Sequence, residues 1–309
     1  MEILKLNDID FLPFPCVVTI GMFDGVHKGH KFMLQDLKTK AQTLGAKSVV
    51  ITFSNHPREV LDSKKEKNPI QLIQTKEERY QKIATQGVDY LIEVFFTMEF
   101  AKITPKEFLN LLQQKTILKA LILGYDNSFG NPNNTEFKEI ISKGQYNETQ
   151  IIQDKTTMYE NNIEISSSAI RRSLKEGNII LANNMLEEEF SISSKVIKGQ
   201  QVGRTLGYPT ANLQIPNNKI IPKDGVYATK VLYNNHLYSS VTNIGQRPTF
   251  EGKDKSMETY IFDFKEDIYN KELRLYFVDY IREEKQFENK YMLANQMKTD
   301  VEEAKKILC

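Results

Sequence analysis

The chain has 309 residues, and its 41 Lys and Arg residues against 40 Asp and Glu residues leave a net charge of +1. This balance argues against a nucleic-acid-binding protein, because non-specific binding to phosphate backbones depends on summed positive charge. The length predicts about two domains. Cys16 and Cys309 form neither a disulfide framework nor a metal-ligand cluster, and no apolar run reaches the roughly 20 residues of a membrane span. We therefore expect a cytoplasmic protein that binds neither nucleic acid nor membranes.

Strand-like and helical segments alternate through the first half of the chain. Short apolar runs predict strands at residues 16–21, 48–53, 90–94 and 120–124. Amphipathic spacing predicts helices at residues 31–44, 75–86 and 105–114. Such alternation is typical of βαβ units, so we expect a parallel sheet with helices on both faces.

The pattern changes near residue 184. Strand-like runs with Gly, Pro and Asn between them follow at residues 195–197, 225–231, 237–241 and 271–281, and Asn234-Asn235 is a hairpin candidate. Helical spacing returns from residue 287 to 308. The sequence therefore predicts a small antiparallel β-barrel with a terminal helix, and two domains at residues 1–184 and 185–309.

One segment, GMFDGVHKGH from Gly21 to His30, follows the first predicted strand and leads into the first helix. Its glycines permit tight turns and a close backbone approach to a ligand. His27 and His30 are three residues apart at a helix N-terminus and share one face. Backbone N–H groups and imidazoles at such a place suit a triphosphate, although the spacing is neither Walker A nor GxGxxG. From the residues alone, helix-capping or core histidines remain the alternative.

A second segment, residues 199–212, joins a Gly-rich loop to the tetrad Pro-Thr-Ala-Asn. In an extended stretch Thr210 and Asn212 point to the same face. Their hydroxyl and amide oxygens can reach a Mg²⁺ ion held by phosphates, since Mg²⁺ takes few protein ligands. The tetrad by itself is equally consistent with an ordinary turn and strand.

The HxGH box resembles the signature of the nucleotidylyltransferase superfamily, and the full string resembles its flavin branch, the bacterial bifunctional riboflavin kinase/FAD synthetase family. Three further segments resemble the same family: Thr52-Phe53 with His56-Pro57, Gly124-Tyr125-Asp126, and residues 165–171 (ISSSAIR). The resemblance implies a Rossmann-like sheet that transfers AMP from ATP to FMN. It implies ATP binding by Gly21, Phe23, Asp24, Gly25, His27, Gly29, His30, Ser167, Ser168 and Arg171. It makes His27 and His30 catalytic, as groups that stabilise charge at the α-phosphorus, and it places flavin at His56, Pro57 and Asp126.

The second half resembles riboflavin kinase. Besides the tetrad, four segments resemble motifs of this family and follow one another in the family's order: residues 225–228 (GVYA), 243–250 (NIGQRPTF), 257–260 (METY) and 281–287 (IREEKQF). The resemblance implies that Gly203, Thr210 and Asn212 bind Mg–ATP, with Thr210 and Asn212 as metal ligands. It makes Glu258 the base that takes the proton of the ribityl 5′-hydroxyl. Arg247 and Arg282 are expected at the flavin, although structural ion pairs explain either residue equally well.

Together these resemblances imply an enzyme that uses ATP and Mg²⁺ to convert riboflavin to FMN and FMN to FAD, with release of pyrophosphate. Residues 127–134 and 186–190 depart from the family's pattern, so an enzyme active only as a riboflavin kinase is one alternative. A non-catalytic flavin-binding regulator is another, although the intact motif residues argue against it. An adenylyltransferase for a different acceptor leaves the second half unexplained.

Overall fold

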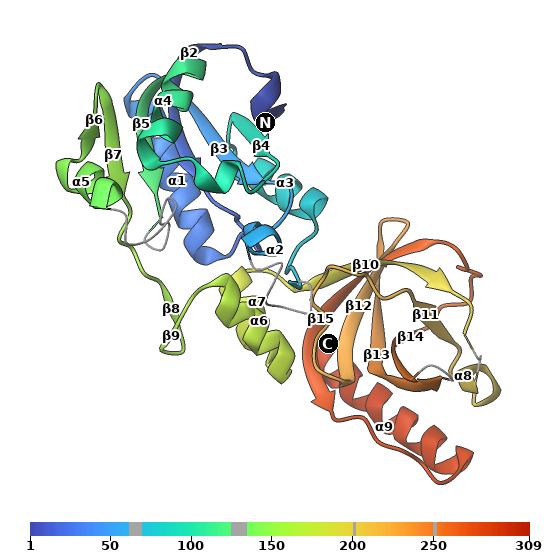
Figure 1. Cartoon of the computed structure of the whole chain (residues 1–309). Helices are drawn as coiled ribbons and strands as arrows, with labels where there is room; N and C mark the ends of the chain where they lie inside the picture. The colour runs from blue at the N-terminus through green and yellow to red at the C-terminus, as the bar shows by residue number, and fades with distance from the viewer. Residues whose placement is uncertain (62–69, 125–134, 200–201, 250–251) are drawn as a thin grey trace. The chain divides into compact units, whose positions relative to one another are not determined.

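The computed structural model describes residues 1–61, 70–124, 135–199, 202–249 and 252–309. Contacts divide the chain into two compact units, Met1–Ile165 and Ser166–Cys309. The first unit is a sheet with helices and the second is built around a barrel (Figure 1). No helix in the described ranges is long and apolar enough to cross a membrane.

A seven-stranded sheet forms the centre of the first unit, in the order β1-β4-β3-β2-β5-β7-β6. Its neighbouring strands are parallel except for β6 and β7. The strands are β1 (Glu2–Lys5), β2 (Leu12–Ile20), β3 (Lys47–Phe53), β4 (Tyr90–Val94), β5 (Thr116–Leu123), β6 (Gln145–Tyr146) and β7 (Thr149–Gln153). The expected parallel sheet is thus confirmed.

Helices cover both faces of this sheet because its side chains alternate between two apolar clusters. Val17 and Val50 pack with Leu34 of α1 (Lys28–Thr43) and Ile83 of α3 (Lys76–Thr85). Val18 and Ile51 belong to the opposite cluster, with residues of α4 (Pro105–Lys115) and α5 (Thr135–Lys143). The remaining elements of the unit are α2 (Pro57–Leu61), the 3₁₀ turns η1 (Leu6–Asp8) and η2 (Phe100–Lys102), and the hairpin β8 (Tyr159–Glu160) and β9 (Ile163–Glu164).

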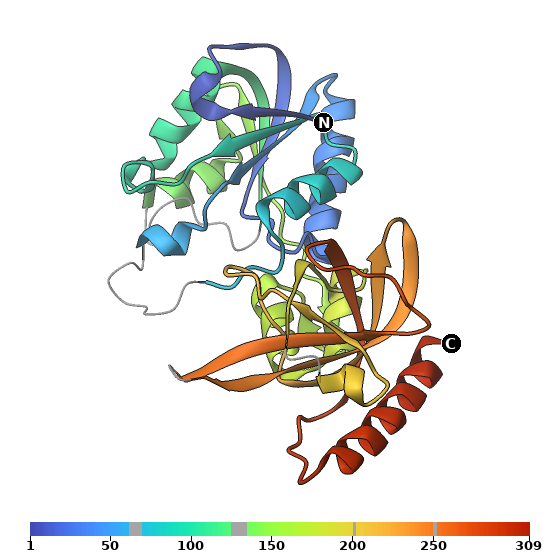
Figure 2. The ribbon, with the colours of Figure 1, turned by 90° about the vertical axis from the view of Figure 1, so that its right-hand side faces the viewer.

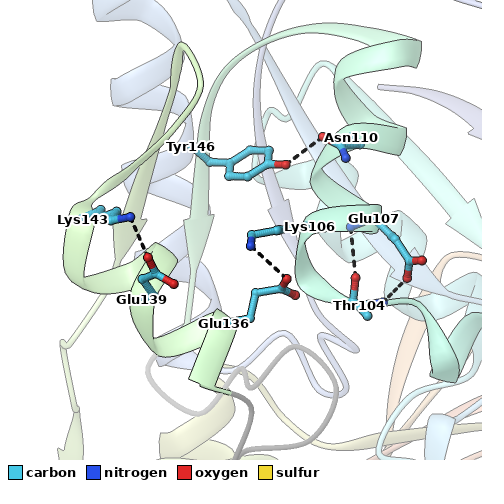
Figure 3. Close-up of polar contacts among 8 residues, drawn as sticks. All are labelled: Thr104, Lys106, Glu107, Asn110, Glu136, Glu139, Lys143 and Tyr146. Carbon is cyan, nitrogen blue, oxygen red and sulfur yellow. Dashed lines mark hydrogen bonds and ion pairs between the residues drawn. The ribbon is translucent and has the colours of Figure 1, made fainter.

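Polar contacts fix α4 and α5 at their ends (Figure 3). Thr104 and Glu107 form a capping box at the start of α4, which satisfies N–H groups that the first helical turn leaves unpaired. Lys106 of α4 lies 3.3 Å from a carboxylate oxygen of Glu136 of α5. The Tyr146 hydroxyl donates to Asn110 at 2.9 Å. These contacts hold the two helices and β6 together.

The second unit contains a closed barrel of antiparallel strands in the order β10-β11-β14-β13-β12-β15. Figure 2 shows this barrel from a second direction. The strands are β10 (Ser191–Ile197), β11 (Thr210–Leu213), β12 (Gly225–Tyr233), β13 (His236–Thr249), β14 (Gly252–Ile261) and β15 (Glu272–Arg282). Its helices are α6 (Ser167–Glu176), α7 (Ile179–Leu186), α8 (Val202–Thr205) and α9 (Lys290–Leu308). The expected barrel and terminal helix are confirmed. Asn234 and Asn235 make the predicted hairpin turn with φ of +48° and +62°, a conformation that Asn tolerates.

The terminal helix α9 is fastened to the barrel by one bidentate ion pair. Arg282, at the end of β15, donates from Nε and Nη2 to the two oxygens of Asp300, each at 2.7 Å. Gln296 donates to the same carboxylate at 2.9 Å. Asp300 is buried, and Ala304 packs nearby on the same helix against Ala228 and Phe262 of the barrel unit. A bidentate, mostly buried pair of this kind fixes both the position and the rotation of the helix.

Replacing Asp300 by Ala leaves the Arg282 guanidinium without its carboxylate, and breaking a buried pair from one side costs about 3 to 5 kcal/mol. We expect the free energy of unfolding of the second unit to fall by about 3 kcal/mol, measured by circular dichroism in urea. Glu303→Ala is the control, because it removes an exposed pair with Lys306 on the same helix, worth under about 1 kcal/mol. Equal losses in the two variants would show that the Arg282 pair has no special role.

Candidate active sites

The turn that follows β2 has an unusual backbone. Gly21 continues the sheet by donating to the Ile51 carbonyl at 3.0 Å. Phe23, Gly25 and Val26 then have φ of +53°, +89° and +39°. Positive φ is strained for a β-branched residue such as Val26, and strain of this kind persists only where the surroundings fix it. The Val26 side chain is fully buried, which accounts for its place in the turn.

Asp24 ties this turn to the segment that precedes α3. Its buried carboxylate accepts the backbone N–H of Ile73 at 3.1 and 3.0 Å and the N–H of Gln74 at 3.1 Å. These N–H donors satisfy the hydrogen-bonding capacity of the buried carboxylate. These contacts give Asp24 a structural role in the turn, and ATP binding by Asp24 stays a prediction.

His27 and His30 lie face to face at the start of α1, with ring centroids 3.6 Å apart. Nδ1 of His27 accepts the N–H of His30 at 3.4 Å and so caps the helix. Nδ1 of His30 is buried and has no hydrogen-bond partner among the described residues. Burial first, and then the neighbouring His27 and Arg79, hold the pKa of His30 well below its ordinary value. His30 is therefore a neutral ring at physiological pH, with a polar atom that the protein leaves unpaired.

The residues after β3 and β4 lie at the same edge of the sheet as this turn, because carboxyl ends of parallel strands share an edge. Asn55 joins the two strand ends by donating to the Phe96 carbonyl at 3.0 Å and accepting the Phe96 N–H at 2.8 Å. Nδ1 of His56 accepts the N–H of Arg58 at 3.1 Å, and Pro57 opens α2. The turn and the predicted flavin residues His56 and Pro57 thus belong to one edge of the sheet.

Arg79 of α3 is a residue of this edge that the sequence analysis missed. Its side chain is fully buried, and Nη2 donates to the carbonyl of Phe53, the last residue of β3. A signal was present in the sequence: Arg79 stands four residues before Ile83, so the two share a helix face, and that face is apolar.

The predicted serine box opens α6 in the second compact unit. Ser166 caps the helix by accepting the N–H of Ala169 at 3.2 Å. Ser167 and Ser168 form the first turn, and Arg171 lies one turn further on. Asp126 and the departing loop at residues 127–134 lie outside the described residues, and Arg247 is described only as part of β13.

The predicted kinase residues meet on one face of the barrel. In the register of β11 and β14, Thr210 lies opposite Tyr260 and Asn212 lies opposite Glu258. Side chains directly opposite each other share a face, and so do residues two apart in a strand. Oγ1 of Thr210 accordingly donates to Oε2 of Glu258 at 3.2 Å. The structure brings a hydroxyl, an amide and a carboxylate together, as the sequence predicted for Thr210 and Asn212.

Two glycines allow the preceding loop to approach this group closely. A Cβ atom at Gly199 would lie 2.2 Å from the amide nitrogen of Asn212, and one at Gly203 would lie 2.3 Å from the Tyr208 carbonyl oxygen. Contacts that short do not occur, so both positions require glycine. Gly203 thereby shapes the loop that leads to Thr210.

A cavity of about 410 Å³ adjoins Thr210. Thr259, Ile261 and Ile268 are among its lining residues, together with Arg204 and Lys265. A volume in this range is within that of small-molecule sites. The lining also includes the acidic residues Glu266 and Asp267 beside Lys265, so its charges are mixed.

Arg282 is the other predicted flavin residue. Its guanidinium forms the ion pair with Asp300 and donates a hydrogen bond to the Glu283 carbonyl at 2.8 Å. Of the two roles open to it from the sequence, the structure shows the ion pair. Flavin binding by Arg282 stays a prediction.

A sheet edge with two stacked histidines at a helix N-terminus and a barrel face with a hydroxyl, an amide and a carboxylate are consistent with an ATP-dependent transferase. A family model described as FAD synthetase matches residues 12–169, and one described as riboflavin kinase matches residues 186–308. The chain belongs to the bifunctional riboflavin kinase/FMN adenylyltransferase family. The predicted family and the predicted class of enzyme, with both a kinase and a nucleotidyltransferase activity, are confirmed.

Relatives named for both activities are similar in sequence to nearly the whole chain. The bifunctional riboflavin kinase/FMN adenylyltransferase of Buchnera aphidicola (from Acyrthosiphon pisum) is 35% identical over 97% of this chain and 96% of its own length. That of Bacillus subtilis is 34% identical over 93% of this chain and 91% of its own. A crystal structure described as a macrolide-efflux protein from Streptococcus pneumoniae matches with a TM-score of 0.87 and 30% identity, over 99% of this chain and 98% of that one. That description belongs to that protein, and both halves of this chain match flavin-enzyme models.

Replacing Gly199 by Ala pushes a methyl group into the Asn212 amide, so we expect riboflavin kinase activity to fall by about 100-fold, since small displacements in a site can cost this much. FAD formation from supplied FMN is expected to stay unchanged. Gly207→Asn is the control, because no described atom lies within 4 Å of a Cβ there and Asn tolerates its φ of +84°. A normal kinase rate in Gly199→Ala would show that the placement of Asn212 is unimportant.

Proposed function

We propose that the two activities of the family use two sets of residues in this chain. Adenylyl transfer to FMN is assigned to residues 1–184, with the turn from Gly21 to His30 as its centre, and phosphorylation of riboflavin to residues 185–309. The matched ranges 12–169 and 186–308 support this division. The observation that supports the proposal is the pairing of Thr210 with Glu258 beside Asn212, because a carboxylate, a hydroxyl and an amide on one face suit a base and metal ligands.

In the kinase step, Glu258 takes the proton of the ribityl 5′-hydroxyl of riboflavin. The freed oxygen attacks the γ-phosphorus of ATP, the bond to the bridging oxygen breaks, and ADP leaves with FMN formed. Thr210 orients the carboxylate through its hydrogen bond, and the cavity beside Thr210 takes the nucleoside of ATP. Positioning and charge neutralisation account for most of the catalysis of such a transfer.

The family's use of a divalent metal with ATP fits this barrel face, and we assign the metal as Mg²⁺. Its protein ligands are Oγ1 of Thr210 and the amide oxygen of Asn212, hard oxygen donors of the kind that Mg²⁺ prefers. When bound, the ion neutralises charge on the phosphates. Gly203 shapes the loop beside the phosphates.

In the adenylyl step, a phosphate oxygen of FMN attacks the α-phosphorus of ATP, the bond to the bridging oxygen breaks, and pyrophosphate leaves. Because Nδ1 of His27 accepts the helix N–H, its proton must be on Nε2, which can donate to a phosphate. His30 stays neutral and offers its unpaired polar edge. The N-terminus of α1 and the backbone at Gly21, Gly25 and Gly29 add N–H donors.

The remaining assignments follow the family resemblance. Phe23, Asp24, Ser167, Ser168 and Arg171 are proposed to contribute to ATP binding. His56, Pro57, Asp126, Arg247 and Arg282 are proposed to contribute to flavin binding. We also propose a cytoplasmic location, which the two free thiols, Cys16 and Cys309, support.

The deciding experiment is a chromatographic time course with riboflavin, ATP and Mg²⁺. We expect FMN to rise first and then to be converted to FAD, because the first product is the substrate of the second site. Accumulation of FMN without FAD, even with FMN supplied, would restrict this chain to the kinase. Absence of any phosphorylated flavin would contradict both assignments.

Two variants separate the sites. Glu258→Gln keeps the shape and removes the base, so FMN formation is expected to fall by about 100-fold or more while FAD formation from supplied FMN is kept. His30→Ala is expected to do the reverse, with FAD formation reduced by about 100-fold. His236→Ala, in the exposed Asn234-Asn235 hairpin, is the matched histidine control. Equal loss of both activities in either variant would contradict two independent sites.

A further inference from the structure

Arg79 of α3 is the largest fully buried side chain in the described chain. A buried guanidinium is rare unless it is paired and hydrogen-bonded. Nη2 donates to the Phe53 carbonyl at 2.5 Å, and Nη1 lies 3.8 Å from the sulfur of Met22. The guanidinium also lies 5.5 Å from the ring centroid of Tyr80, whose side chain interacts with it. Nε has no hydrogen-bond partner within the described ranges. The fold therefore buries a cation whose donors it uses only in part.

Two of the groups that Arg79 contacts, Met22 and Phe53, lie at the ends of strands that lead into the proposed site. Met22 belongs to the turn after β2 that carries both histidines, and Phe53 is the last residue of β3, three residues before His56. Asp24 binds the same turn to Ile73 and Gln74, directly before the capping box of α3. The beginning of α3 is thus connected to the turn twice, through the Asp24 carboxylate and through the Arg79 guanidinium.

The charge of Arg79 acts on His30. Burial lowers the pKa of Arg79, while Tyr80, Asp24 and Glu77 oppose this effect, and arginine stays protonated in proteins. The same charge, after burial and together with His27, lowers the pKa of His30. A fixed positive charge in a water-poor site stabilises negative charge that develops nearby during a reaction. The electrostatic partner expected for this cation is the polyphosphate of the nucleotide.

We propose that Arg79 is a positioning residue for adenylyl transfer. Its guanidinium fixes the ends of β2 and β3 against α3 and supplies a fixed positive charge that acts on His30. The inference rests on the proposed function of the turn from Gly21 to His30. It adds a residue from a third element, α3, to a site otherwise assigned to the segments after β2 and β3.

Three variants test this role. Arg79→Gln keeps hydrogen-bond donors and removes the charge, whereas Arg79→Lys keeps the charge and loses the planar fork of donors. Lys102→Gln removes an exposed cation of η2 and serves as the matched control. FAD formation from FMN is followed as kcat and as KM for ATP. Riboflavin phosphorylation by the same preparation reports whether the rest of the chain is intact.

For Arg79→Gln we expect kcat/KM for adenylyl transfer to fall by about 100-fold, with kinase activity within twofold of the wild type. Arg79→Lys is expected to recover at least about tenfold of that loss, because the charge remains. A rate within threefold of the wild type in Arg79→Gln would overturn the proposal.

A second readout does not depend on turnover. The chain has four histidines, so their imidazole proton resonances can be assigned one by one and titrated by nuclear magnetic resonance. The groups that act on His30 are His27 of α1 and Arg79 of α3, with Asp24 of the turn acting on Arg79. Loss of the Arg79 charge is expected to move the midpoint of His30 upward in Arg79→Gln and to leave it low in Arg79→Lys.

The two readouts separate the possible failures. If the titration midpoint of His30 does not change in Arg79→Gln, the role of Arg79 is structural only, even where FAD formation is lost. If Arg79→Gln does not fold, Arg79→Lys carries the test, and a raised His30 midpoint there would overturn the proposal. If the wild-type chain makes no FAD from supplied FMN, the proposed function of the turn fails, and the His30 titration still decides whether the charge of Arg79 reaches that ring.

Discussion

The first unit depends on one constraint, which is that backbone polar groups at the carboxyl ends of a doubly covered parallel sheet must be paired or left for a ligand. Part of this edge is closed by the chain itself: Gly21 donates to Ile51, Ser54 donates to Val94, and Asp154 donates to Leu123. Side chains pair further backbone groups at this edge: the Asp24 carboxylate accepts the Ile73 N–H, and the Asn55 amide accepts the Phe96 N–H. What stays unpaired, above all at His30, is available for substrate.

The interior of the barrel contains polar groups that must also be paired, and these are hydroxyl groups that bond to one another. Thr229 exchanges hydrogen bonds with Ser240 and Thr242 at 2.8 Å, and Thr242 continues to Thr259 at 2.9 Å, all of them fully buried. A satisfied buried network specifies register, because a slip by one residue would turn each hydroxyl to the other face. Since Thr259 points inward, Glu258 must point to the opposite face, beside Thr210 and Asn212. The interior network therefore fixes the position of the proposed base.

The sequence predicted the alternating core of the first unit well, because β2 to β5 are apolar runs that both faces of the sheet bury. It missed β14, whose sequence GKDKSMETYI is too polar to give an apolar run, and β1, which pairs through its backbone while Ile3 stays exposed. Candidate residues in continuous motifs, such as HKGH and PTAN, could be found because their spacing is local. Arg79 belongs to no such motif, and its place on the apolar face of the helix is a weak signal because a charged residue in the run KEERYQK is ordinarily solvated. Its role depends on the carbonyl of Phe53 and the sulfur of Met22, which only the tertiary fold brings to it.

The two proposed sites differ in the groups that balance the negative charge of phosphate. The barrel face presents oxygen atoms from Thr210, Asn212 and Glu258, which repel phosphate unless a cation lies between them. The sheet edge has two stacked imidazoles and a helix N-terminus, and the buried cation of Arg79 acts on one of these rings, that of His30. A site of the second kind holds part of its countercharge permanently, so its electrostatics are set by folding rather than by metal concentration. On the proposed role, this need for a buried countercharge accounts for the arginine on the apolar face of α3, whereas the buried carboxylate of Asp24 is held by the N–H groups of Ile73 and Gln74.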